Sequence, residues 1–195
     1  INVLPVNDLP VRTSGTTEPL IITSTNLQVA LNGSATGGSY YQSLSLGLEK
    51  MDYSVGGDQK EETSQNLIIS VISVPNPKLG TVTLNDKEAT PVTEGMTLTL
   101  EDLRTLQFVT QADALSLGAS ERIGTFTYTV ADQAVADQGQ PGAGPSLSLQ
   151  ESITIYAAGN AAAAQAMKLL LDLLGENPDP VDVANYIQDF EKASN

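Results

Sequence analysis

Residues 67–74, which read LIISVISV, carry the clearest secondary-structure signal in the chain. Ile and Val are β-branched and favour strands, where their side chains pack on a pleated surface. A nearly continuous apolar run of this length is typical of a strand inside a sheet, with neighbours on both sides. We therefore expect a central strand at 67–74 and a fold built mainly from β-sheet.

Further strand candidates occur on both sides of this segment, separated by Gly, Pro, Asn and Asp. They are 27–31, 41–48, 79–84, 96–100, 124–130 and 147–156. In the second of them, alternation places Leu44, Leu46 and Leu48 on one face. Strands at such short intervals are typical of a sandwich, and we predict about eight or nine of them. Residues 12–19 are expected to form an irregular crossing loop, and residues 132–145 a hairpin loop.

The composition changes at Gly159, because the residues that follow are dominated by Ala and Leu, which are strong helix formers. Asn160 can cap a helix that ends at Gly175, and Pro180 favours the start of a second helix. The predicted fold is therefore an all-β sandwich followed by a short C-terminal α-helical hairpin at residues 159–195.

The two predicted helices carry apolar stripes, and these are our candidates for binding a partner. The stripe residues are Met167, Leu170, Leu174, Ile187 and Phe190. Helices this short cannot bury such stripes by themselves. We expect them to dock on the sandwich, on a partner or on another copy of the chain.

Charge and composition exclude several classes of function. The net charge is −14 with nine basic residues, which argues against binding to nucleic acid. The chain has neither Cys nor His, so thiolate nucleophiles, Ser-His-Asp triads and Cys-based zinc sites are ruled out. Carboxylate chemistry is left, but no spacing selects a pair of carboxylates. No segment reaches the length of about 18 apolar residues that a membrane span needs. We predict a non-catalytic protein with no membrane span.

Several ordered motifs resemble the bacterial cadherin-like or immunoglobulin-like tandem repeats of large secreted surface proteins. The motifs are INVLPVNDLP at 1–10, LEKMDYSVGGD at 48–58, LIISVISVPNPKLGTVTL at 67–84, LRTLQF at 103–108, GTFTYTV at 124–130 and LSLQESITIY at 147–156. The first of these is similar to the junction between two repeats. The resemblance implies that residues 1–12 are the tail of a preceding repeat with its linker, and that residues 13–158 form one cadherin-like sandwich.

The resemblance also implies a cofactor, because cadherin-like repeats commonly bind Ca²⁺ between neighbouring domains through linker and loop oxygens. The matching positions are Asn7, Asp8 and Asp52. The sequence departs from strong calcium patterns, since Lys60 stands among the carboxylates of residues 58–61 and no DxDxDG loop occurs. The alternative is that these acidic residues are solvated charges on loops and edge strands.

Together these features predict an extracellular structural or adhesive module at a bacterial cell surface. Its partners would be neighbouring repeats or subunits, with self-association through edge strands or the C-terminal helices. The alternative is a module that binds carbohydrate or another ligand. Tyr40, Tyr41 and Tyr53 could then form a stacking platform, although tyrosines on strands more often pack in a core.

Overall fold

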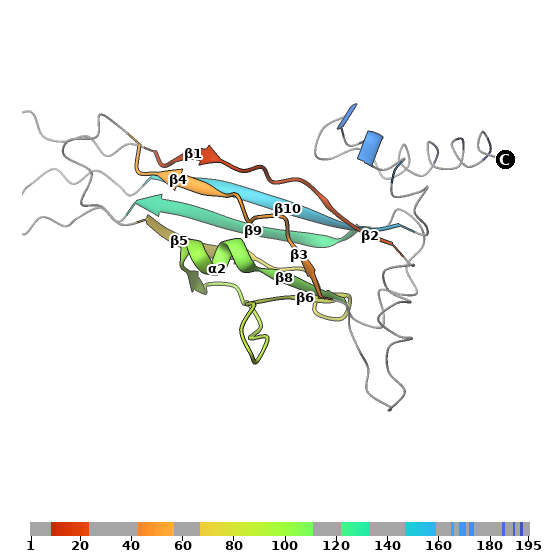
Figure 1. Cartoon of the computed structure of the whole chain (residues 1–195), viewed down its shortest axis with the longest axis horizontal. Coiled ribbons are helices and arrows are strands. Elements are labelled where there is room, and N and C mark those ends of the chain that lie inside the picture. The colour runs from red at the N-terminus through yellow and green to blue at the C-terminus, as the bar shows by residue number, and fades with distance from the viewer. Residues whose placement is uncertain are drawn as a thin grey trace, which may run out of the picture.

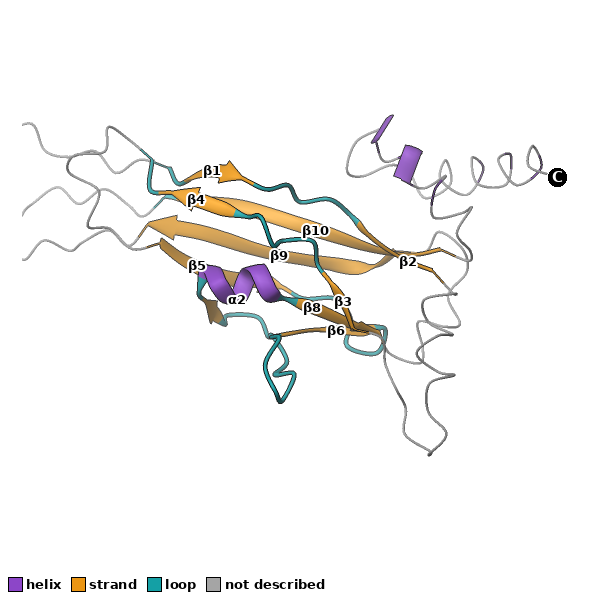
Figure 2. Cartoon of the chain, viewed as in Figure 1, coloured by secondary structure: helices purple, strands orange, loops and turns teal. Residues whose placement is uncertain are grey.

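The computed structural model describes residues 9–23, 43–56, 67–110, 122–132 and 147–158, and a few positions beyond them. Those positions are Gln165, Lys168, Leu169, Leu170, Asp172, Leu173, Asn185, Asp189 and Lys192, all helical. Over the described part, the chain is mostly β-strand arranged in several sheets, with few short helices (Figures 1 and 2).

The strands run in chain order as β1 (Val11–Ser14), β2 (Leu20–Thr23), β3 (Ser43–Ser45), β4 (Asp52–Ser54), β5 (Leu67–Ser73), β6 (Gly80–Thr83), β7 (Thr97–Leu98), β8 (Gln107–Thr110), β9 (Arg122–Asp132) and β10 (Ser148–Ala158). The helix α2 (Leu100–Thr105) lies between β7 and β8.

The largest sheet has five strands in the order β2-β10-β9-β5-β7. Its long pairs, β9 with β10 and β5 with β9, are antiparallel, whereas β2 runs parallel to β10. The strand β5 has a partner on each side, which confirms the prediction of a central strand made from its continuous apolar sequence.

The remaining strands form a three-stranded sheet, β3-β8-β6, and a two-stranded sheet, β1-β4. Gly47, at a φ of 78°, lies in the segment that separates β3 from β4. Leu46 and Leu48 are at most 2% exposed and Leu44 packs against the core, so the three leucines point inward as predicted. The strand itself is shorter than the predicted 41–48, because β3 ends at Ser45. Figure 1 shows β1 and β4 in front of β9 and β10.

One apolar cluster draws residues from the five-stranded and the three-stranded sheets. From β9, alternate residues Phe126, Tyr128 and Val130 enter it with no exposed surface, while threonines occupy the positions between them. From the other side, Phe108 of β8 and Val82 of β6 are equally buried. This alternation is the period of two that a strand imposes, and it gives each sheet one apolar face.

The helix α2 is not among the elements predicted from the sequence, although a local signal for it is present. Thr99 caps the helix by accepting a bond from the backbone N–H of Asp102, and the Asp102 carboxylate accepts from the N–H of Thr99. This reciprocal pair is a capping box, and the spacing Thr-x-x-Asp is its sequence signal for the start of a helix. Leu103 anchors the helix, since it has no exposed surface.

The segment predicted as an irregular crossing loop is the second difference. Residues 12–14 of this segment belong to β1, which starts at Val11, and the segment is followed directly by β2. The backbone forms ladder bonds here although the local sequence is rich in Ser, Thr and Gly. The predicted strand 27–31, the loop after Asp132 and the helix caps Asn160 and Gly175 lie outside the described residues.

Beyond Ala158, every position that the structure describes is helical, as the Ala- and Leu-rich sequence predicts. Of the helices in the described part of the chain, none has the length and apolarity to cross a membrane.

Candidate functional site

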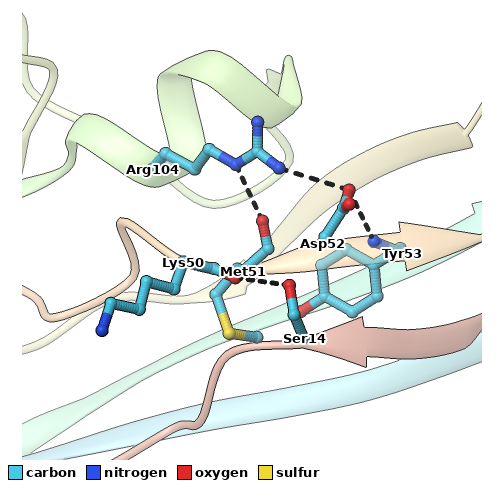
Figure 3. Close-up of polar contacts among 6 residues, drawn as sticks. All are labelled: Ser14, Lys50, Met51, Asp52, Tyr53 and Arg104. Atoms are coloured by element: carbon cyan, nitrogen blue, oxygen red, sulfur yellow. Dashed lines mark hydrogen bonds and ion pairs between the residues drawn. The ribbon is translucent and has the colours of Figure 1, made fainter.

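Asp52, the described member of the predicted calcium site, stands at the start of β4 in a group of polar contacts (Figure 3). Its Oδ1 lies 3.2 Å from Nη2 of Arg104 and accepts a bond of 3.1 Å from the backbone N–H of Tyr53. Nε of Arg104 donates to the carbonyl of Met51 at 2.8 Å. The carboxylate is therefore tied to the last turn of α2.

These contacts bear on the calcium prediction directly. The guanidinium of Arg104 lies beside the carboxylate of Asp52, and its positive charge would repel a cation bound there. Asn7 and Asp8, the other predicted ligands, lie outside the described residues. Within the described residues, no group of three acidic, His or Cys side chains is placed to hold a metal ion.

The next residue along β4, Tyr53, points the opposite way and enters the interior, where it is 7% exposed. Its hydroxyl lies 2.7 Å from the hydroxyl of Tyr128, which comes from β9 and has no exposed surface. Burial raises the pKa of Tyr53 to about 12, although the hydrogen bond between the two hydroxyls works against that rise. Burial, and next the bond to Tyr53, raise the pKa of Tyr128. Both phenols stay neutral at ordinary pH.

A second contact joins the same two sheets beside the tyrosines. Nη1 of Arg12, on β1, lies 3.2 Å from Oε2 of Glu151, on β10. The strand registers explain why the two contacts are neighbours, because Arg12 is directly opposite Tyr53 and Glu151 is directly opposite Tyr128. We call these four residues, Arg12, Tyr53, Tyr128 and Glu151, the cross-sheet lock.

The chemistry of the cross-sheet lock suits a structural role, which is to hold β1 and β4 against β9 and β10. Its phenols do not ionise near neutral pH, and its carboxylate is paired with a guanidinium. What the four residues do is connect β1 and β4 with β9 and β10 through polar contacts that are partly or wholly withdrawn from water. Polar groups in such places specify one arrangement of the strands, because any other arrangement leaves them unpaired.

The sequence contained part of the signal for this lock. Glu151 falls two residues from Leu149 and from Ile153, so strict alternation along β10 places the carboxylate on the inward face. Arg12 was placed in a loop, and no local pattern shows that it meets a residue 139 positions away.

The structure places only one of the predicted partner-binding residues, Leu170, which is 5% exposed. Its neighbours Leu169 and Leu173 are 43% and 68% exposed, and Nζ of Lys168 lies 3.9 Å from the carboxylate of Glu18, in the segment between β1 and β2. Met167, Leu174, Ile187 and Phe190 lie outside the described residues. Tyr53 is interior, so it cannot belong to a stacking platform, and Tyr40 and Tyr41 are outside the described part.

Comparison of this chain with protein-family models, with curated protein sequences and with solved structures finds no match.

Proposed function

We propose that this chain is a non-catalytic structural or adhesive module of a bacterial surface protein, with an immunoglobulin- or cadherin-like sandwich as its body. In this proposal, the module works outside the cell and makes protein–protein contacts with neighbouring repeats or subunits. The sequence motifs at 1–10 and 48–58 motivate the comparison with tandem repeats.

Strand order supports the proposed fold. An immunoglobulin-type sandwich places its first, second, fifth and fourth strands in one sheet, and its third, sixth and seventh in the other. When β3 and β4 are counted as two halves of one interrupted strand, the sheets β1-β4 and β3-β8-β6 join into a single strand order that matches the first of these sheets. The neighbours β5, β9 and β10 of the five-stranded sheet match the third, sixth and seventh strands of the other sheet.

The observation that carries the proposed role is the way the first strands divide between the sheets. β1 pairs with β4, while β2, five residues further on, leaves that sheet and pairs with β10. The chain segment nearest the repeat-like junction is thus held by both sheets, and the cross-sheet lock adds Arg12 to Glu151. This is an arrangement suited to a spacer that must keep its entry point fixed relative to its body.

The partner surface in this proposal lies on the C-terminal helical segment. Leu169 and Leu173 are one helical turn apart and both exposed, so they form an apolar strip facing solvent. Adjoining apolar side chains that are exposed to solvent are typical of surfaces that contact another protein. Ca²⁺ near Asn7, Asp8 and Asp52 is a further part of the proposal, as an ion that binds weakly because it competes with Arg104 for Asp52.

Sedimentation velocity over a range of concentrations tests the proposal. We expect the intact chain to self-associate, and the double substitution Leu169→Glu/Leu173→Glu to weaken that association. Ile72→Glu is the matched control, because Ile72 is 48% exposed but lies on β5 of the five-stranded sheet. A chain that stays monomeric at every concentration and binds glycans on an array would replace the structural role with the ligand-binding alternative.

A further inference from the structure

The two ends of the β-body are held by strands that run side by side in the same direction. β2 and β10 are parallel, and their register pairs Leu20 with Ile155 and continues to Thr23 with Ala158. β2 is among the first strands of the described body and β10 is the last. If the chain is pulled at both ends, β2 is drawn toward its start and β10 toward its end. Two parallel neighbours must then slide past each other in opposite directions.

Sliding loads the ladder differently from peeling. When neighbouring strands are sheared along their length, all hydrogen bonds between them carry the load together. When strands are peeled apart from one end, the bonds break one at a time. Forced unfolding is governed by the rate of crossing the unfolding barrier, so a sheared ladder resists tension more strongly than a peeled one of equal stability.

The cross-sheet lock lies on the same load path. Arg12 precedes β2 in the chain, so tension that enters from the N-terminal side reaches Arg12 before it reaches Leu20. Its guanidinium is tied to Glu151 on β10 at 3.2 Å, and the two side chains are 36% and 12% exposed. A second contact on β1 joins the hydroxyl of Ser14 to the carbonyl of Lys50 at 2.8 Å (Figure 3). The N-terminal strands are therefore attached to β10 at two places, β1 through the side chain of Arg12 and β2 through its ladder.

We propose that the Arg12–Glu151 pair and the parallel β2–β10 ladder act together as a force-bearing clamp, which keeps the body folded when neighbouring modules pull on its two ends. This inference rests on the proposed function, because only a module in a mechanically coupled assembly meets such tension. It assigns Arg12 a mechanical role that its contribution to equilibrium stability does not reveal.

Single-molecule force spectroscopy on the full chain, held at its two ends, tests the clamp. We expect Arg12→Gln to raise the unfolding rate at a given force about tenfold, because the lost contact is broken before the barrier is crossed. The charge exchange Arg12→Glu/Glu151→Arg should recover most of that loss. Arg104→Gln is the matched control, since it removes an ion pair with the same 3.2 Å separation that lies off the path between β1 and β10. Its unfolding rate under force should change less than about twofold.

A second pulling direction separates mechanical from general stability. The chain contains no Cys, so Lys87→Cys, in the exposed turn after β6, gives a single attachment point. Pulling between residue 87 and the C-terminus bypasses β1 and β2, and we expect a lower unfolding force and no effect of Arg12→Gln. Equal forces in the two directions, or equal effects of Arg12→Gln and Arg104→Gln, would overturn the clamp. Either result leaves the association test of the proposed function untouched, and a monomeric chain in that test leaves the measured forces unchanged.

Discussion

The side chains of two adjacent residues of β4 lie in different regions, one at the surface and one in the interior. Asp52 turns outward and meets Arg104, and Tyr53 turns inward and meets Tyr128 beside the Arg12–Glu151 pair. Both ion pairs have N–O distances of 3.2 Å. The carboxylate is 49% exposed in the outer pair and 12% exposed in the inner one.

The comparison shows that distance alone does not set the strength of a polar contact. Water screens the outer pair and competes for both of its partners, so its net contribution to stability is small. The two tyrosine hydroxyls of the inner region are withdrawn from water, and a partner that is removed there leaves the other group unsatisfied. In the Arg12–Glu151 pair the difference from the outer pair lies in the carboxylate, because the guanidinium of Arg12 is 36% exposed and that of Arg104 is 38% exposed. Equal geometry should therefore give unequal consequences, and substitutions on the two sides of β4 can measure the difference.

The largest effect should come from removing a whole side chain on the inner side. We expect Tyr128→Ala to lower the free energy of unfolding by about 3–5 kcal/mol, because it leaves a cavity and also removes the partner of the Tyr53 hydroxyl. Asp52→Ala, on the outer side, should change it by less than about 1 kcal/mol. Urea titration of both variants measures these values, and similar losses would contradict the contrast.

The next effect isolates the hydroxyl pair. Tyr128→Phe should lower the free energy of unfolding by about 1–3 kcal/mol, since the Tyr53 hydroxyl is left buried without its partner. The double substitution Tyr53→Phe/Tyr128→Phe should be more stable than the single one, because neither hydroxyl then needs a partner. A double-mutant cycle in urea gives the coupling between the two residues. A double variant no more stable than Tyr128→Phe would show that the hydroxyls do not act as a pair.

Alkaline pH should act on the inner region through the same two phenols. Their pKa values are raised in the folded state above the ordinary value of 10.0, to about 12 for Tyr53. The stability they contribute is complete below pH 10 and is lost as the pH rises through that interval, because the unfolded chain releases the protons first. Urea midpoints measured from about pH 9 to about pH 11 should fall more steeply for the native chain than for the double Phe variant. Parallel slopes would argue against the assigned pKa shifts.

A smaller effect should distinguish the two ion pairs at equilibrium. We expect Arg12→Gln to lower the free energy of unfolding by about 1–2 kcal/mol, between the values typical of exposed and of buried pairs. Arg104→Gln should have a smaller effect, and added salt should reduce the contribution of the Arg104–Asp52 pair further. Thermal unfolding at low and high ionic strength measures both. If added salt reduced the contribution of the Arg12–Glu151 pair more than that of the Arg104–Asp52 pair, the inner pair would be the more strongly screened one, which contradicts the expected difference.

The smallest effect concerns calcium. Because Arg104 already neutralises Asp52, we expect Ca²⁺ in place of EDTA to raise the melting temperature by no more than about 2 °C. Arg104→Gln should enlarge that rise if Asp52 is a ligand, since the competing charge is gone. A large rise in the unsubstituted chain, abolished by Asp52→Ala, would show that Ca²⁺ displaces Arg104.

Much of the secondary structure could be predicted locally. The run at 67–74 gave β5, the alternation at 124–130 gave β9, and the Ala- and Leu-rich segment after Gly159 is helical wherever the structure describes it. The misses have local causes too. The capping box of Thr99 and Asp102 is a short local signal for α2. β1 contains the strand formers Val11 and Thr13, but the Ser, Thr and Gly around it are typical of a loop, and its pairing with β4 decides its conformation.

The sequence by itself determined the long strands at 67–74, 124–130 and 147–156, which of their faces is apolar, and that His and Cys chemistry is excluded. Only the tertiary structure decided that Tyr53 meets Tyr128 and that Arg12 meets Glu151. The reason is that alternation is a property of neighbouring residues, whereas strand pairing and register follow from burying all the apolar faces together. Contacts between residues 75 and 139 positions apart are products of that global arrangement, and no local pattern specifies them.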